Sequence, residues 1–91
     1  MLIVISYDVP DDRRRAKLAK SLEGWGDRVQ LSVFEFHLEA GELEDLRARV
    51  LDLIEPKEDN VRIYSLCEAC RRKVEVYGRA RLSERPDVYV L

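Results

Sequence analysis

The sequence predicts a small α+β domain in which strands and amphipathic helices follow one another along the chain. Three observations support this: a continuous apolar run at residues 2–6, an alternating segment over 28–38, and two segments with apolar residues at helical spacing. A chain of 91 residues suffices for one domain with a two-layer core, but not for a deep enclosed cofactor pocket. We therefore expect a single two-layer unit.

Composition narrows the class of protein. Apolar residues make up 46% of the chain and charged residues 37%, as in a folded protein with a charged exterior. The net charge of −2 excludes a polycation that coats nucleic acid, so contacts with phosphate must be local. No apolar stretch approaches the roughly 20 residues that span a bilayer, and the start lacks the basic region and cleavage site of a signal peptide. We expect a cytoplasmic protein without a membrane contact.

The first strand is predicted over residues 2–6, "LIVIS". Because this run is apolar throughout and rich in β-branched residues, we expect both of its faces to be covered. Pro10 disfavours further pairing, and Asp11 or Asp12 is expected to cap a helix. One face of that helix carries Leu18, Ala19, Leu22 and Trp25, and "GWG" at 24–26 ends it.

The segment from Arg28 to Leu38 alternates, with Val29, Leu31 and Val33 on one face. Alternation alone favours one long strand. A βαββαβ order instead requires this segment to bend into two strands, and the pattern leaves that choice open.

The second half of the chain repeats the helix and strand patterns. A helix is predicted after Gly41 and before Pro56, and a strand from Asn60. "KVEVYG", from Lys73, is a shorter candidate strand, and Val88 to Val90 could form an edge strand. The apolar residues at helical spacing are Leu43, Leu46, Val50, Leu53 and Ile54.

Asp8 is the strongest candidate for chemistry. It follows Tyr7 at the end of the first strand, where a carboxylate can face solvent while a sheet holds its backbone. Such a rigid oxygen ligand suits Mg²⁺, which takes one or two protein carboxylates and keeps several waters. The local sequence alone favours a turn aspartate or a helix cap. Capping is the expected role of Asp11 and Asp12.

Basic residues are concentrated in two places. The first helix carries Arg13, Arg14, Arg15, Lys17 and Lys20, which either contact phosphates or form a solvated face with local ion pairs. The second concentration consists of Arg71, Arg72, Lys73, Arg79, Arg81 and Arg85, whereas acidic residues load the second helix. This segregation leaves room for one basic surface despite the negative net charge.

Cys67 and Cys70 have the spacing of half a zinc site. A closed site needs four ligands, and His37 is the only histidine, so a Cys₄ site would require two chains. A redox pair, a local disulfide and ordinary small residues are the alternatives. The sequence has no glycine-rich phosphate loop and offers little support for nucleophilic catalysis.

The stretch "YDVPDDRRR" after "LIVIS", followed by "RVQLSVFEF" from Arg28, resembles the CRISPR-associated protein 2 family over roughly residues 1–78. The resemblance implies a ferredoxin-like βαββαβ two-layer sandwich over 1–78, with residues 28–38 forming two strands that reverse around Ser32 and Val33. It also implies a homodimer in which the second subunit covers the sheet. The tail, 79–91, would add an edge strand at the dimer interface.

The same resemblance implies a function. Members act as Mg²⁺-dependent endonucleases on single-stranded RNA or double-stranded DNA, or as non-catalytic bridges for the CRISPR integrase, CRISPR-associated protein 1. Asp8 matches the family's motif aspartate, and it is the predicted catalytic and metal-binding residue. The positions matching nucleic-acid contacts are Tyr7, Arg14, Arg15, Arg28 and Phe34. Packed aromatic rings and surface ion pairs are the alternatives for these, and an unrelated regulatory ferredoxin-like dimer is the alternative for the whole protein.

Overall fold

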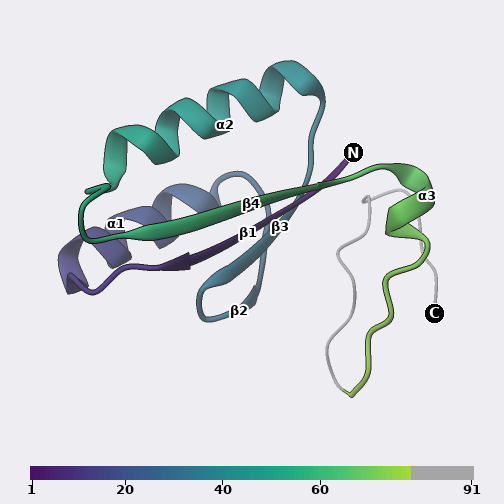
Figure 1. The fold of residues 1–91 in the computed structure, drawn as a ribbon, viewed down its shortest axis with the longest axis horizontal. Helices are drawn as coiled ribbons and strands as arrows, with labels where there is room; N and C mark the ends of the chain where they lie inside the picture. The colour runs from purple at the N-terminus through teal and green to yellow at the C-terminus, as the bar shows by residue number, and fades with distance from the viewer. Residues whose placement is uncertain (79–91) are drawn as a thin grey trace.

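The computed structural model describes residues 1–78, in which a four-stranded antiparallel sheet carries two helices on one side (Figure 1). The strand order is β2-β3-β1-β4, so β1 lies between β3 and β4. This βαββαβ order is that of a ferredoxin-like sandwich, which confirms the predicted fold. The elements are β1 (Leu2–Asp8), α1 (Asp12–Glu23), β2 (Asp27–Gln30), β3 (Val33–His37), α2 (Ala40–Leu53), β4 (Asn60–Leu66) and α3 (Glu68–Arg71).

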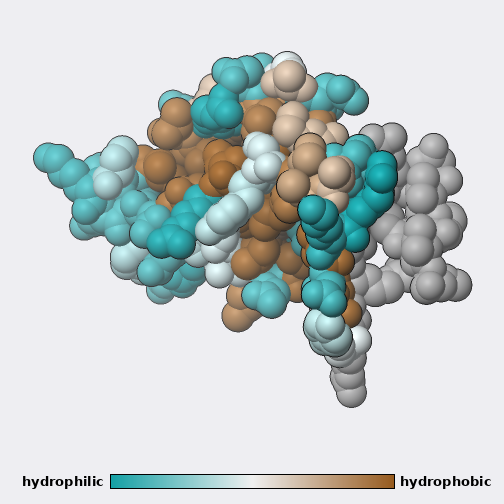
Figure 2. All heavy atoms as spheres, turned by 45° about the vertical axis from the view of Figure 1, so that its right-hand side comes forward, coloured by the Kyte–Doolittle hydropathy of each residue, from teal (hydrophilic) through white to brown (hydrophobic). Residues whose placement is uncertain are grey.

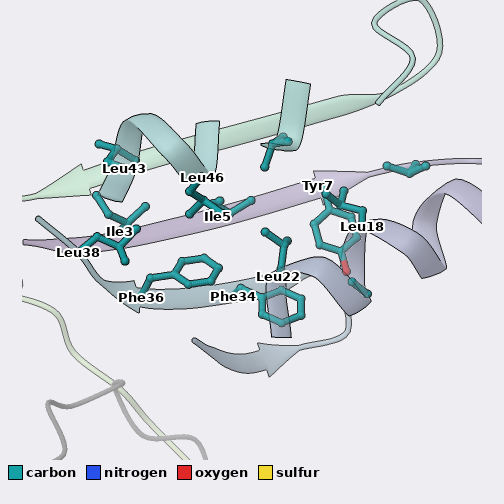
Figure 3. Close-up of a cluster of buried hydrophobic side chains, with 13 residues drawn as sticks. Ile3, Ile5, Tyr7, Leu18, Leu22, Phe34, Phe36, Leu38, Leu43 and Leu46 are labelled. Carbon is teal, nitrogen blue, oxygen red and sulfur yellow. The ribbon is translucent and has the colours of Figure 1, made fainter. Parts of the chain in front are cut away.

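The core lies between the sheet and the two helices (Figure 3). Ile5 of β1 lies opposite Phe34 of β3 and Ile63 of β4, so apolar side chains from three strands meet on the helix side. Leu22 of α1 and Leu46 of α2 are fully buried against them. Burying side chains of this size supplies roughly 1.5–3 kcal/mol each, so this layer is the main source of stability.

Residues 28–38 form two strands, and the single strand that alternation favoured is wrong. The structure confirms the reversal that the resemblance implies, but places it at Leu31 and Ser32, one residue earlier than expected, because Val33 already belongs to β3. The Tyr7 backbone N–H donates to the Ser32 carbonyl at 3.1 Å, and the Tyr7 hydroxyl donates to the Leu31 carbonyl at 3.3 Å. Because these bonds come from β1, no pattern within 28–38 could reveal them.

The start of α1 follows the predicted capping signal, whereas α2 begins at Ala40, before Gly41 rather than after it, at a cap that was not predicted. Asp11 is the N-cap of α1, and its carboxylate accepts a hydrogen bond from the Arg14 backbone N–H at 2.9 Å. In α2, the Glu42 carboxylate accepts from the Glu39 backbone N–H at 2.9 Å, and the helix ends before Pro56. At the start of each helix, a side-chain carboxylate therefore accepts a hydrogen bond from a backbone N–H that has no partner within the helix.

The strand predicted from Lys73 is wrong. Residues 73–78 follow α3, form neither strand nor helix, and lead away from the sheet (Figure 1). Val76 and Tyr77 remain exposed. A segment with alternating apolar residues forms a strand only when another strand pairs with it. Within the described residues, no strand pairs with residues 72–78. The predicted strand at Val88 to Val90 lies outside the described residues. No helix within residues 1–78 has the length and apolarity needed to cross a membrane.

Candidate functional site

Asp8 is the last residue of β1, and its side chain is on the side of the sheet opposite the helices. Alternation along β1 directs Ile3, Ile5 and Tyr7 into the core, where each is at most 4% exposed. Asp8 is exposed and lies opposite Asn60 of β4. The buried Val9 follows it directly. The backbone on both sides is therefore held, while the carboxylate faces solvent as predicted.

A shallow hollow of about 260 Å³ opens beside this carboxylate. Carboxylate, amide, hydroxyl and guanidinium groups meet in it. In residues 1–78, no hydrogen bond or ion pair engages the Asp8 side chain. The lining residues are Ser6, Tyr7, Asp8, Asn60, Arg62 and Tyr64.

The donors around Asp8 fit a magnesium ion better than a softer metal. Asn60 lies opposite Asp8 in the ladder and Ser6 lies two residues before it, so the nearby donors are oxygens. Magnesium accepts one or two protein carboxylates and keeps several waters, and an open hollow leaves room for these. Residues 1–78 contain no cluster of three or more histidine, cysteine or acidic side chains able to hold a metal. Asp8 is the one carboxylate among the residues that line the hollow.

The two aromatic rings predicted to contact nucleic acid lie in the core. Phe34 is 0% exposed and Tyr7 is 4% exposed, with their ring centroids 6.3 Å apart. Burial raises the pKa of the Tyr7 hydroxyl, against the opposing effect of the Arg28 charge. Since neither ring offers a free face, bases cannot stack on them in this conformation, and both residues serve packing instead (Figure 3).

Arg14 has a structural role that the sequence did not reveal. Its Nε and Nη2 atoms donate to the two carboxylate oxygens of Asp59 at 2.8 and 2.9 Å, and Nη2 also contacts Glu58 at 2.9 Å. The Asp59 side chain is fully buried and accepts a further bond from the Glu55 backbone N–H. Hydrogen bonds from Arg14 hold the pKa of the Asp59 carboxyl below its usual range. This bidentate pair ties α1 to the loop that leads into β4.

Arg15 and Arg28 are also engaged within the chain. Arg15 donates to the Val9 carbonyl at 2.9 Å and pairs with Asp12. Arg28 donates to the Leu31 carbonyl at 2.6 Å and lies over the Phe34 ring, 5.6 Å from its centroid. Both side chains are partly exposed, so they could still approach a ligand, but their first role is to hold the two turns beside β1.

Three other cations on α1 have no partner in the described part of the chain. Arg13, Lys17 and Lys20 are exposed and spaced along one face of the helix. The sequence alone did not distinguish these three cations from Arg14 and Arg15. The structure distinguishes them, because Arg14 and Arg15 form ion pairs with acidic side chains of the same chain.

Asn60 and Arg62 were missed as site residues. The alternation of β4 places them on the face opposite Val61 and Ile63, but the sequence could not show that this face adjoins Asp8. The missing information was the register between β1 and β4. Such registers depend on packing between distant segments.

Cys67 and Cys70 lie at the start of α3, and both are exposed. The Cys70 backbone N–H donates to the Cys67 sulfur at 3.4 Å, and this bond lowers the pKa of the Cys67 thiol. The neighbouring Cys67 sulfur raises the pKa of Cys70. Within residues 1–78 no further ligand completes a zinc site.

Comparison with known proteins identifies the family. The family model described as CRISPR associated protein Cas2 matches residues 1–74. The chain belongs to the Cas2 family. This membership rules out the alternative of an unrelated ferredoxin-like dimer.

Individual Cas2 proteins are similar in sequence to this protein over nearly its whole length. A CRISPR-associated endonuclease Cas2 of Thermus thermophilus is 47% identical over 99% of this chain and 96% of its own. A CRISPR-associated endoribonuclease Cas2 of Synechocystis is 42% identical over 99% and 98%. Among solved structures, a chain of a partial Cas6-RT-Cas1–Cas2 complex superimposes with a TM-score of 0.77 at 30% identity, covering 99% of this chain and 98% of that one.

Proposed function

We propose that this protein is a cytoplasmic, metal-dependent endonuclease of the Cas2 family that hydrolyses phosphodiester bonds at Asp8. The observation that carries the proposal is the unpaired Asp8 carboxylate, which the end of β1 presents rigidly to an open polar hollow. Relatives that cover the same length are named endonuclease and endoribonuclease. The matched length includes β1 and β4, the strands that build the hollow.

The residues of the hollow would have different roles in catalysis. Asp8 would hold a magnesium ion with the help of the Asn60 amide oxygen. When bound there, this ion would polarise the phosphate and lower the pKa of a bound water. Asp8 would hold the ion at a defined position, because its backbone is paired with Asn60 of β4 and β1 is also paired with β3 as far as Ser6.

A homodimer would complete the site. The face of β1 away from the helices carries Val4 and Ser6, which are only partly buried in a single chain, and the neighbouring Tyr64 is 48% exposed. In the space-filling view, hydrophobic residues gather across the middle of the visible face and hydrophilic ones lie at its margins (Figure 2). A second copy that covers the open sheet face would explain the apolar character of residues 2–6. A two-fold axis there would bring two copies of Asp8 together.

Cleavage assays with single-stranded RNA and double-stranded DNA test the catalytic proposal. In Mg²⁺, Asp8→Asn should lose on the order of 10²–10⁴-fold in rate, the usual contribution of a group that activates the attacking nucleophile. EDTA should remove the activity of the unaltered protein. Asp52→Asn, which changes an exposed carboxylate of α2, is the matched control and should retain the rate. Cleavage that survives Asp8→Asn would remove Asp8 from the mechanism.

A second function, that of a non-catalytic adaptor for the Cas1 integrase, is favoured by two observations. The chain superimposes on 98% of one chain of the partial Cas6-RT-Cas1–Cas2 complex. In addition, α1 presents the unpaired cations Arg13, Lys17 and Lys20 in one row, an arrangement that can follow a phosphate backbone without reading bases. This function requires shape and positive charge but no carboxylate at position 8.

Capture of duplex DNA together with Cas1 separates the two functions. Changing Arg13, Lys17 and Lys20 to glutamine should weaken DNA capture, whereas Asp8→Asn should not weaken it. Changing Lys57, exposed beyond α2, to glutamine is the control for loss of one positive charge. Failure of the unaltered protein to bind either Cas1 or DNA would exclude the adaptor function.

A further inference from the structure

The hollow beside Asp8 contains one cation, Arg62 of β4, to which no role is yet assigned. Ser6 lies opposite Arg62 in the ladder, and Asp8 lies opposite Asn60. Asp8 and Arg62 are therefore diagonal neighbours on the same face of the sheet. Such neighbours lie roughly 7–8 Å apart, a separation that a long side chain can bridge.

Arg62 differs from most other arginines of the described chain in having no partner. Six of the nine arginines in residues 1–78 form a hydrogen bond or ion pair through their side chains, namely Arg14, Arg15, Arg28, Arg47, Arg49 and Arg71. Arg62 is exposed and forms none within this part of the chain, and no ion pair joins it to Asp8. Within a single chain, its guanidinium is therefore available to a ligand that enters the hollow.

The positive charge of Arg62 favours the approach of a phosphate group to the hollow. A lone carboxylate at Asp8 repels the phosphate that must approach it, and this repulsion acts before any metal is bound. A guanidinium on the neighbouring strand offsets that charge and offers paired N–H donors that match two oxygens of a phosphate. Because Arg62 lies within a strand whose backbone is paired with β1, those donors start from a fixed position.

We propose that Arg62 binds the phosphate of the nucleic-acid backbone that lies in the Asp8 hollow. The inference rests on the proposed function and names the group that holds the substrate at that site. Arg62 binds the phosphate whether or not a metal ion is present, so its contribution can be measured separately from cleavage.

Binding of a fluorescent duplex and of a single-stranded RNA, measured in EDTA from about 50 to about 200 mM salt, tests this role. Arg62→Gln should weaken binding about tenfold at the lower salt concentration, as expected when a charged hydrogen bond is removed. It should also reduce the slope of log affinity against log salt by about 1, because one phosphate is no longer neutralised. Arg62→Lys should restore the slope, because the charge remains, while the cleavage rate in Mg²⁺ stays low because the paired donors are absent.

Arg47→Gln is the matched control, since it removes a partly exposed arginine that pairs with Glu44 on α2, away from the sheet. It should bind as the unaltered protein does. Identical affinity and slope for Arg62→Gln and the unaltered protein would overturn the role of Arg62 while leaving the proposed function intact. Light scattering on Arg62→Gln adds a second criterion: conversion to a monomer would show that Arg62 joins subunits instead of binding phosphate. A lack of binding by the unaltered protein in EDTA would overturn the role of Arg62, whereas the proposed function would fall only if cleavage in Mg²⁺ were also absent.

Discussion

Gly26 shows how one residue fixes the junction between α1 and β2. A Cβ atom at this position would lie 2.5 Å from the Glu35 carbonyl oxygen and 2.6 Å from Cδ1 of Phe36. Both atoms belong to β3, and Phe36 is buried, so neither can move without disturbing the core. The backbone approaches β3 this closely only because glycine has no side chain.

Gly26→Ala should therefore lower the free energy of unfolding by about 1–3 kcal/mol, as forced overpacking does. Urea denaturation provides the measurement. Gly41→Ala is the control, because a Cβ there would meet nothing within 4 Å. It should be neutral or stabilising by up to about 1 kcal/mol, given the better helix propensity of alanine. Equal effects of the two substitutions would contradict the close approach at Gly26.

The two cysteines should differ in reactivity although they are three residues apart. The pKa of Cys67 is lowered by the hydrogen bond from the Cys70 backbone, whereas the pKa of Cys70 is raised. The thiolate is the reactive form, so Cys67 should be alkylated faster between about pH 7 and about pH 9. Iodoacetamide labelling of the unaltered protein, followed by mass spectrometry that separates modification at Cys67 from modification at Cys70, would measure both rates. Faster labelling of Cys70 would contradict the hydrogen bonding seen at α3.

At the scale of elements, the Arg14–Asp59 pair fixes where α1 lies relative to the start of β4. The folded state lowers the pKa of Asp59, so the pair stabilises the protein above the unfolded pKa of about 4. This stabilisation should disappear as the pH falls through the lowered value. Asp59→Asn should thus destabilise the protein at neutral pH, and the difference from the unaltered protein should shrink on acidification.

Denaturation from about pH 7 to about pH 3 would follow this difference. A double-mutant cycle with Arg14→Gln isolates the pair from each residue's other contacts. The coupling energy should be favourable at neutral pH and approach zero in acid. A coupling independent of pH would show that the charge on Asp59 contributes nothing.

The elements also show what the sequence could and could not predict. The helices and β1 were predicted because apolar spacing and capping residues are local signals. The break at Leu31 was not visible in the alternation, since the hydrogen bonds that hold it come from Tyr7. The strand expected from Lys73 failed because a strand needs a partner, which local alternation cannot supply. For the site, Asp8 was predictable from its position after an apolar run, whereas Arg62 required the register of β1 with β4.

At the scale of the whole molecule, the proposed homodimer should dissociate when a charge is introduced on the open face of the sheet. Tyr64→Glu places a charge on the open face of the sheet, so it should convert the protein to monomers, as measured by light scattering. Leu51→Glu is the matched control, because Leu51 is 61% exposed on α2, away from that face. It should leave the mass unchanged. A dimer that persists in Tyr64→Glu but dissociates in Leu51→Glu would place the interface on the helices.

The sheet order has a consequence for how the chain is made. Leu2 pairs with Leu66, so the central strand acquires its second neighbour only from a segment synthesised near the end. Contacts between such distant positions are slow to form, and loop closure must precede them. A nascent chain that has emerged from the ribosome only as far as α2 still has one edge of β1 uncovered. Completion of the fold must therefore wait until β4 has been synthesised, and until then the growing polypeptide exposes an unpaired strand edge of the kind that promotes aggregation.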